Sequence, residues 1–459
     1  MSILGNDLLL GSGDEGYNLT RSLRFRASAS AYLNRTPATT TNQKTWTWSM
    51  WVKRGALSTQ QAIFDIASGS AGVPRGGFYF ETDNTLNFLF NTSGSSFNVQ
   101  LVTTQVFRDP SAWYHIVFSV DTTQATAANR IKVYVNGTQV TAFSTATYPA
   151  QNTDFPVNSN VLHNIGKLAN NVSYFDGYLT EVNFIDGQAL TPSSFGETDI
   201  ITGVWKPKRY AGTYGTNGFY LPFTDNSALT TSSNVGLGKD FSGNGNYWTT
   251  NNISITAGTT YDSMTDVPTL TSATASNFCT LNPLDNLAAV PSGGNLNQGV
   301  SNPYTRCNST IFVSSGKWYF EVTLNTAGTN TSVGIGQNNN NVNQYPGYDA
   351  KSFVQEIDNA RKGTNDTYTA YGTALTAGQV FMCAIDLDNL KLFFGGQGTW
   401  FASSNPVTGA NPAFTVTAGL YCAISRPYGG SAAISINFGQ RPFTYTPPTG
   451  FVALNTYNL

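Results

Sequence analysis

The sequence predicts an all-β protein built from two antiparallel β-sandwich domains joined by a long linker. Three observations favour this fold class. Aromatic residues make up 13% of the 459-residue chain, whereas Lys, Arg, Asp and Glu together make up 11%, a balance that suits strands better than solvated helices. Short runs with alternating apolar side chains recur between turns rich in Gly, Asn, Ser and Thr. The chain is also too long for one ordinary hydrophobic core, so at least two domains are expected.

Residues 17–225 are expected to form the first sandwich. Within residues 45–53, alternate side chains share one face, because strand side chains point to opposite sides of a sheet in turn. The residues predicted to face the core of this domain are Trp46, Trp48, Met50, Val52, Leu86, Phe88, Phe90, Ile131, Val133 and Val135. Asn136 and Gly137 follow the last of these, and this pair predicts a tight hairpin turn.

Residues 226–276 are richer in Ser, Asn, Gly and Thr and are predicted to be a linker that adds a strand or pins the two domains together. Residues 277–455 are expected to form the second sandwich, in which Trp318, Phe320, Val322 and Leu324 share one face. An Asn-rich tract at residues 338–343 predicts an exposed loop, because Asn side chains compete with the backbone for hydrogen bonds. Residues 354–361 alone have a helical pattern, of one or two turns.

Charge and cysteine content exclude several classes of function. With 24 basic and 26 acidic residues the chain has no basic stripe, so nucleic acid is not an expected partner. Residues 1–16 lack the basic start of a signal peptide and are expected to be a short anchor segment; no membrane insertion is expected. The four cysteines have no metal-ligand spacing and are expected to be buried small hydrophobes: Cys279, Cys307, Cys383 and Cys422.

The first half resembles the laminin-G/concanavalin A-like lectin family. The resemblance rests on three segments in the family's order, which are AWYHIVFSVD at residues 112–121, IKVYVNG at 131–137 and FDGYLTEVNF at 175–184. These match the family's tryptophan-led strand, its "yvNG" hairpin and its "f-G-x-i-x-e-v" strand. The resemblance implies a jelly-roll sandwich.

The second half resembles the SPRY domain family. The segments that carry this resemblance are GKWYFEV at residues 316–322, VGIG at 333–336, YG at 371–372, AIDLD at 384–388, LFFGG at 392–396 and INFGQRPF at 436–443. One departure is Gly395-Gly396, which is expected to form a hairpin turn where the family has Asn-Gly. The resemblance implies a second β-sandwich.

The two domains in this order resemble virion structural proteins of tailed bacteriophages, especially marine podovirus-like ones. That resemblance implies a location on the virion surface after synthesis in the host cytoplasm. It also implies other virion proteins as partners, a homo-oligomer, and adhesion to host surface glycan or protein. The place on the particle, as head decoration or as tail or fibre component, stays open. An alternative is a decoration subunit that acts only in virion stability.

No enzymatic activity is expected. Glycosidases of the concanavalin A-like fold carry a Glu-x-Asp-x-x-Glu strand, and the nearest approach here, Glu81 and Asp83, has Leu86 in place of the third carboxylate. A glycan-cleaving enzyme is therefore a weaker alternative. His115 and His163 lie in apolar runs and are expected to be core residues rather than parts of a catalytic triad.

We assign no cofactor. The lectin resemblance leaves a calcium ion open, since four aspartates are placed at predicted strand ends, but Asp is also a common turn residue. They are Asp65, Asp121, Asp176 and Asp186.

Ligand binding is expected at the loops of the second domain, because loops carry function on rigid sandwiches. Aromatic and arginine side chains beside Pro or Gly are the candidates, although each could instead cap its own sheet. The predicted site residues are Tyr345, Tyr348, Trp400, Arg426 and Tyr428.

Overall fold

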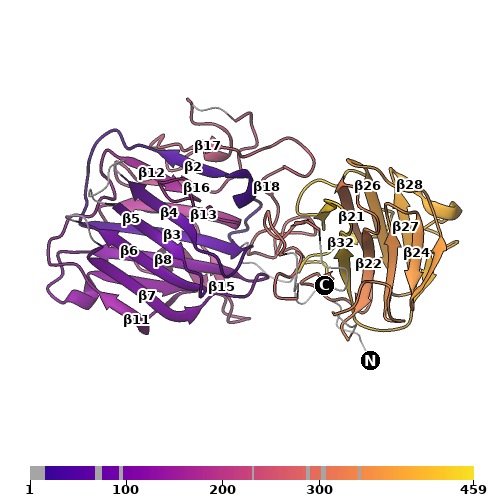
Figure 1. The fold of residues 1–459 in the computed structure, drawn as a ribbon. Helices are drawn as coiled ribbons and strands as arrows, with labels where there is room; N and C mark the ends of the chain where they lie inside the picture. The colour runs from indigo at the N-terminus through magenta and orange to yellow at the C-terminus, as the bar shows by residue number, and fades with distance from the viewer. Residues whose placement is uncertain are drawn as a thin grey trace.

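A computed structural model describes residues 16–67, 75–92, 97–229, 232–285, 290–300, 306–339 and 343–459. The predicted anchor, except Gly16, and residues 340–342 of the Asn-rich tract lie outside this part. The chain is nearly all β: the described helices are single 3-10 turns at Ala27–Ala29, Ala127–Asn129, Pro192–Ser194, Gly236–Gly238 and Phe401–Ser403. Two sandwiches follow one another along the chain (Figure 1). No described helix is both long and apolar enough to cross a bilayer.

The first domain stacks two eight-stranded antiparallel sheets. The β3 sheet runs β10-β9-β8-β3-β13-β1-β18, with β16 beside β13. Its strands are β1 (Ser22–Phe25), β3 (Thr45–Arg54), β8 (Trp113–Asp121), β9 (Ile131–Val135), β10 (Thr138–Gln139), β13 (Gly177–Asp186), β16 (Phe219–Leu221) and β18 (Ser263–Met264). The β5 sheet runs β11-β7-β6-β5-β4-β12-β2-β17. Its strands are β2 (Tyr32–Arg35), β4 (Gln61–Ala67), β5 (Arg75–Phe80), β6 (Thr85–Asn91), β7 (Val99–Val106), β11 (Phe143–Thr147), β12 (Leu162–Ile165) and β17 (Thr249–Asn251).

The second domain stacks an eight-stranded sheet on a six-stranded one. The β21 sheet runs β19-β31-β21-β26-β27-β28, with β29 beside β27 and β32 beside β21. Its strands are β19 (Asn297–Gln298), β21 (Lys317–Thr326), β26 (Val380–Asp386), β27 (Lys391–Gly396), β28 (Thr399–Trp400), β29 (Phe414–Thr415), β31 (Ala433–Asn437) and β32 (Val452–Ala453). The β22 sheet runs β20-β30-β22-β23-β24-β25. Its strands are β20 (Cys307–Asn308), β22 (Ser332–Gln337), β23 (Ser352–Glu356), β24 (Arg361–Thr364), β25 (Thr367–Ala370) and β30 (Tyr421–Arg426).

The predicted core faces are confirmed. Trp46, Trp48, Met50 and Val52 of β3 all lie in the core between the two sheets of the first domain, together with the predicted residues of β6 and β9. In the second domain the four alternate residues of β21 from Trp318 to Leu324 lie in one core in the same way. All four cysteines are buried and unbridged, as expected.

Turn predictions were partly right. Asn136 and Gly137 both have positive φ, 48° and 79°, as a tight hairpin between β9 and β10 requires. The prediction of a turn at Gly395-Gly396 was wrong. Both glycines lie in β27, and the turn follows at Gln397 and Gly398, whose φ values are 53° and 78°. Leu375 and Phe401 explain the glycine at 396, since a Cβ there would come within 3.0 Å of either side chain.

The helical pattern of residues 354–361 also proved wrong. These residues form the end of β23, a turn and the start of β24. Val354 and Glu356 pair with β22 on one side and with β24 on the other. The hydrogen bonds of these two strand pairings outweigh a short helical pattern, because an isolated helix of one or two turns is only marginally stable.

Residues 226–276 connect the two domains, and part of this segment is also built into the first domain. Strand β17 extends the β5 sheet, β18 extends the β3 sheet, and Trp248 enters the core. In Figure 1 this segment lies on and beside the first domain and leads to the second.

Buried ion pairs attach the connecting segment, which carries Asp262 and Asp266, to the first domain at what we call the joint, made of Arg24, Lys53, Trp113, Asp262 and Asp266. Lys53 Nζ donates to Asp266 at 2.8 Å, and Arg24 Nε donates to Asp262 at 3.0 Å; all four side chains are fully buried. Trp113 Nε1 donates to the other Asp266 oxygen at 3.0 Å. Three aromatic side chains of the first domain, Trp51, Trp113 and Tyr178, are part of the second domain's core. The joint is therefore a continuation of that core.

Candidate functional site

Four of the five predicted site residues lie together on the outer face of the β22 sheet. We call the surface that they form with Tyr368 the tyrosine–arginine surface; it consists of Tyr345, Tyr348, Tyr368, Arg426 and Tyr428. The ring of Tyr345 meets that of Tyr348 edge-on at 5.4 Å between centroids. The Arg426 guanidinium lies 5.4 Å from the Tyr345 ring and 4.9 Å from the Tyr428 ring. One buried cation thus holds two rings by cation–π contacts.

Hydrogen bonds fix the loop between β22 and β23 that carries Tyr345 and Tyr348. The Tyr345 hydroxyl donates to Asp366, and the Tyr368 hydroxyl donates to the carbonyl of Pro346 at 2.8 Å. The Gly347 amide donates to Ser352 Oγ at 2.9 Å. These contacts hold residues 345–347 in place, and the neighbouring Tyr348 is 42% exposed.

Charged groups alternate beneath the rings. The strand register places Arg426 beside Ser332, Ser332 beside Glu356, and Glu356 beside Arg361. Glu356 and Arg361 form an ion pair whose Nε–Oε2 distance is 2.8 Å. Burial raises the pKa of Glu356, although Arg361 opposes that shift, and burial lowers the pKa of Arg426. Burial and Asp366 together raise the pKa of Tyr345 to about 12, so its hydroxyl stays protonated at neutral pH.

Trp400, the fifth predicted residue, lies elsewhere. It is on β28, where its ring meets Tyr319 edge-on at 6.4 Å and packs with Phe443 and Tyr445 on the outer face of the β21 sheet. Its half-buried ring covers its own sheet, which is the alternative role considered for each aromatic residue.

Arg306 was missed by sequence reasoning. Only 1% of it is exposed, and its three guanidinium nitrogens have no hydrogen-bond partner within the part of the chain that the structure describes. Burial lowers its pKa to about 10, while the charge of Asp349 opposes this shift. No local pattern distinguishes this arginine from one on the surface, because its burial depends on residues far away in the sequence, such as Asp349, whose charge acts on it.

The acidic residues considered for catalysis or calcium binding each accept hydrogen bonds from other groups of the chain and do not converge on a shared site. Asp83 accepts from Thr85 N and Oγ1, and these hydrogen bonds lower its pKa, while Glu81 accepts from Gln60 and Asn87. The candidate calcium ligands likewise have separate partners, which are Tyr79 for Asp65, Thr123 for Asp121, Gly294 for Asp176 and Asn217 for Asp186. No group of three or more Asp, Glu, His or Cys residues that could hold a metal occurs among the described residues.

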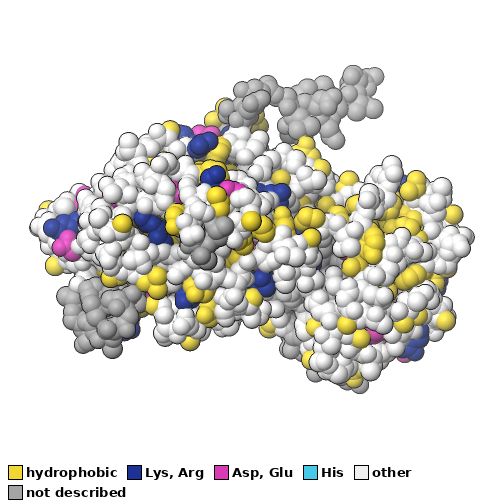
Figure 2. All heavy atoms as spheres, turned by 90° about the horizontal axis from the view of Figure 1, so that it is seen from above, with side chains coloured by type: hydrophobic (Ala, Val, Ile, Leu, Met, Phe, Trp, Pro, Cys, Tyr) yellow, Lys and Arg dark blue, Asp and Glu magenta, His cyan; other side chains and the backbone are white. Residues whose placement is uncertain are grey.

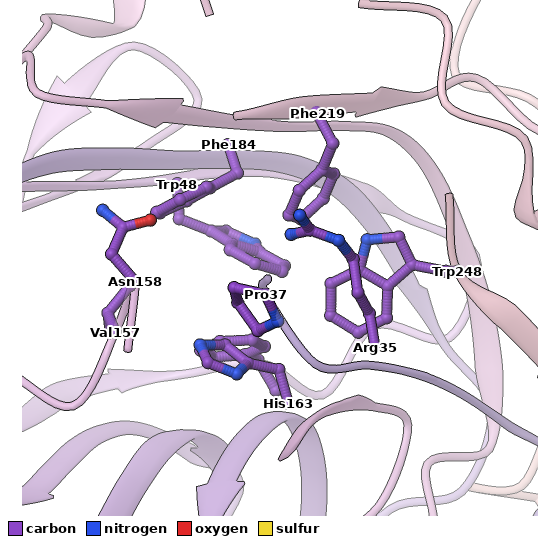
Figure 3. Close-up of a pocket in the computed structure, with 10 residues that line it drawn as sticks. Arg35, Pro37, Trp48, Val157, Asn158, His163, Phe184, Phe219 and Trp248 are labelled. Atoms are coloured by element: carbon purple, nitrogen blue, oxygen red, sulfur yellow. The ribbon is translucent and has the colours of Figure 1, made fainter. Parts of the chain in front are cut away.

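Both histidines are buried. His115 bonds Ser49 and Trp205, and burial lowers its pKa to about 3; His163 has a pKa lowered to about 4 for the same reason. His163 lines a cavity between the sheets of the first domain, and Figure 3 shows its ring below those of Trp48 and Trp248. This cavity has a volume of only about 10 Å³ for the centre of a water molecule. It is therefore too small for an organic ligand.

A larger cleft of about 260 Å³ lies on the outer face of the β3 sheet, with Glu181 at its floor. Glu181 sits in a β-bulge of β13 with φ of 53°, and its two oxygens accept from Tyr220 at 2.6 Å and Tyr17 at 3.0 Å. Burial raises its pKa to about 7. Both oxygens are engaged by protein hydroxyls, which indicates a structural network that attaches residue 17 to the sheet.

Comparison with known proteins agrees with this geometry. Residues 27–194 match the family described as the concanavalin A-like lectin/glucanases superfamily, and residues 317–441 match the SPRY domain. The chain therefore consists of a concanavalin A-like domain followed by a SPRY domain.

The similar proteins match this chain over only part of their own length. Ran-binding protein 9 of Danio rerio is 28% identical over 143 residues, which are 30% of this chain and 22% of that protein. The ATP-dependent RNA helicase DDX1 of Xenopus laevis is 28% identical over 151 residues, 32% of this chain and 19% of that protein. The match thus spans about a fifth of each relative. Among solved structures, the SPRY domain of human HERC1 is 14% identical, with 34% of this chain and 96% of that domain covered and a TM-score of 0.28.

Proposed function

We propose that this chain is a non-catalytic recognition protein whose SPRY domain binds a protein partner through the tyrosine–arginine surface. The observation that carries the proposal is the exposed Tyr348 ring on a loop held from below by Asp366, Ser352 and Tyr368. Fixed, half-exposed aromatic side chains beside a buried arginine are typical of interface anchors, because little side-chain entropy is lost on binding. The name of the Ran-binding relatives supports a protein as the class of partner.

The setting that we propose is the surface of a tailed-bacteriophage virion, as head decoration or as tail or fibre component. The support is the domain pair together with a composition rich in Gly, Asn, Ser and Thr and poor in charge. On one face Figure 2 shows scattered hydrophobic side chains and few charged ones. In this setting the partners are other virion proteins and a protein or glycan of the host surface, and the chain assembles as a homo-oligomer.

Site-specific cross-linking on purified particles tests both parts. A photo-crosslinking phenylalanine analogue replaces Tyr348 in one variant and Trp400 in a matched control. We expect mass spectrometry to find the chain in the particles, and a cross-linked partner for position 348 but none for position 400. Particles without the chain would contradict the virion setting, and equal cross-linking at both positions would contradict the assigned surface.

A decoration subunit that serves virion stability alone is the second candidate, and the joint favours it, because Trp51, Trp113 and Tyr178 of the first domain are part of the second domain's core and make a firm two-domain body. Particles lacking the chain discriminate the two. A recognition protein requires that adsorption to host cells falls, whereas a decoration subunit requires normal adsorption with lower heat tolerance. Release of reducing ends from host polysaccharide by the purified chain would instead indicate a glycan-cleaving enzyme.

A further inference from the structure

The hairpin formed by β14 (Gly196–Thr198) and β15 (Trp205–Pro207) presents the most exposed large aliphatic side chains among the described residues. Its tip, residues 199–204, is called the finger here. Ile200 is 98% exposed, Ile201 82% and Val204 61%. Single exposed hydrophobic residues are ordinary on protein surfaces, but three within five positions form a patch that is typical of interaction sites.

Hydrogen bonds fix the conformation of the finger. One carboxylate oxygen of Asp199 accepts from the amides of Ile201 at 3.0 Å and Thr202 at 2.8 Å, and also from the Thr202 hydroxyl. The Gly203 amide donates to the Asp199 carbonyl at 2.9 Å, and the Asp199 amide donates to the carbonyl of Val204 at 2.8 Å. The amides of Asp199, Ile201, Thr202 and Gly203 are therefore engaged within the finger, so a partner can displace water from the tip without leaving these donors unpaired.

The base of the hairpin is anchored in the first domain. Trp205 Nε1 donates to Nδ1 of the buried His115 at 2.9 Å, and the two rings stack at 5.9 Å. The His115 ring stacks in turn on Trp51 at 5.0 Å, and its Nε2 bonds Ser49 at 2.9 Å. Lys206 joins the two strands through Glu197 and Asp199. The isoleucines are thus held in water by a rigid support, which lowers the entropic cost of docking.

The charge at the finger favours a protein partner over an anionic lipid surface. Asp199 adjoins Ile200, and the hydrogen bonds from Thr202 lower the pKa of Asp199 to about 2, so its carboxylate is ionised at every physiological pH. An anionic lipid surface would repel this charge at the depth to which the isoleucines insert. A protein pocket needs only a shape that accepts two aliphatic side chains.

A groove occurs at the free edge of the same sandwich. It measures about 350 Å³ and lies next to the edge strands β10 and β11, and its lining combines the apolar Val135, Val140 and Ala142 with the polar residues Thr104, Gln105, Asn136, Thr138, Gln139 and Thr141. Unpaired edge strands are favourable sites of association. Groove and finger lie close together, since Asn136 lines the groove and Gly137 packs against the Trp205 ring. A formal net charge of −2 over 459 residues gives little repulsion between copies.

We propose that the Ile200–Ile201 finger of one copy docks in the edge groove of a second copy, and that the second copy's finger docks reciprocally in the first. When a projection and its complementary groove lie side by side on one molecule, a two-fold axis beside them satisfies both contacts at once. The interface is isologous and closed. It makes the first domain the dimerising half of the chain and leaves the tyrosine–arginine surface on the second domain available.

Analytical ultracentrifugation of the full chain tests the proposal. We expect a monomer–dimer equilibrium whose dissociation constant rises at least a hundredfold with the double change Ile200→Asp and Ile201→Asp. The matched control is Val407→Asp, which alters an exposed apolar residue (55%) on the second domain and should leave the equilibrium unchanged. Circular dichroism and unfolding midpoints verify that each variant is folded.

A disulfide test locates the contact. The pair Ile201→Cys and Thr141→Cys should give a covalent dimer under mild oxidation, whereas Ile201→Cys with Val407→Cys should give none. Two results would overturn the proposal. One is a wild-type chain that stays monomeric at the highest concentration used in the ultracentrifuge, and the other is a dimer whose dissociation constant is unchanged by Ile200→Asp and Ile201→Asp. Binding of the wild type, but not the double variant, to vesicles of phosphatidylcholine and phosphatidylserine would overturn it in favour of a lipid surface.

Discussion

The joint and the tyrosine–arginine surface each contain a buried cation, but the groups around that cation differ in exposure. In the joint, Lys53 is fully buried and its ammonium donates to Asp266, Asn277 and the carbonyl of Phe278. At the tyrosine–arginine surface Arg426 is also buried, at 5% exposure, but two of the tyrosine rings around it are half-buried and Tyr348 is exposed. A cation whose donors are satisfied by the chain contributes to structure, whereas a cation that supports exposed rings prepares a surface for contact.

The largest effect is expected in the joint. Asp266→Ala removes the carboxylate that Lys53 and Trp113 both contact and leaves the Lys53 charge buried without its counter-ion. We expect the free energy of unfolding to fall by about 3–5 kcal/mol, the usual cost of breaking a buried pair on one side. Urea denaturation followed by tryptophan fluorescence measures this change.

Two controls interpret that result. Asp154→Ala disrupts an exposed pair with Lys44, 3.7 Å apart, and should cost less than about 1 kcal/mol. The double change Lys53→Met and Asp266→Leu removes both charges and should recover most of the loss. An Asp266→Ala variant as stable as the wild type would show that the buried ion pair does not stabilise the fold.

A second effect comes from Glu181, a buried acid held by two tyrosines rather than by a cation within hydrogen-bond distance. Its pKa is raised from 4.5 to about 7 in the folded chain, so between these pH values the folded state keeps a proton that the unfolded state has lost. The stability contributed by this proton is complete below pH 4.5 and is lost as pH rises through 7. The loss is on the order of 3 kcal/mol.

Comparison with Glu181→Gln isolates this group. His115 and His163, with pKa values lowered to about 3 and 4, act in the opposite direction and stabilise the fold as pH rises to about 6.5. Because both proteins carry these histidines, the difference between wild type and variant should show the Glu181 contribution alone, with the variant gaining relative stability from pH 4.5 to 7. A difference independent of pH would mean that Glu181 is ionised throughout this range.

Sequence reasoning succeeded where the determining contacts are local. Alternation along β3 and β21 fixes which residues face a core, and Asn136-Gly137 fixes its own turn. It was wrong at residues 354–361, because a short apolar pattern suits a helix or a strand until its ladder partners are known. The joint could not be foreseen, since Lys53 and Asp266 are 213 positions apart and each is ordinary in its own segment.

The candidate site shows the same limit. Tyr345, Tyr348, Arg426 and Tyr428 were selected because they stand beside Pro or Gly in loop-like segments, and the fold brings them together. Trp400 met the same criterion but packs on the other sheet, because neighbouring Tyr319 and Phe443 offer it an apolar surface. Sequence position identifies a loop, but packing decides whether its aromatic residue covers the protein or remains exposed.

The third prediction concerns Arg426, which contacts both the interior and the surface. Arg426→Ala removes the cation beneath Tyr345 and Tyr428 and should lower the free energy of unfolding by about 1–2 kcal/mol. Arg426→Lys keeps the charge but loses the planar group, so we expect an intermediate loss. Urea denaturation measures both, and equal stability of the alanine variant would indicate that the cation does not hold the two rings.

The smallest effect on folding is expected at Tyr348, where a change also tests most directly how the tyrosine–arginine surface differs from the joint. Its exposed ring makes one edge contact with Tyr345, so Tyr348→Ala should change the free energy of unfolding by less than about 0.5 kcal/mol. If the surface mediates adhesion, particles carrying this variant should adsorb to host cells at least tenfold more slowly, while Tyr348→Phe, which keeps the ring, should adsorb nearly normally. Normal adsorption of the alanine variant would show that this surface does not take part in host recognition. A fall in the free energy of unfolding above about 2 kcal/mol would show that Tyr348 has a structural role, as the residues of the joint do.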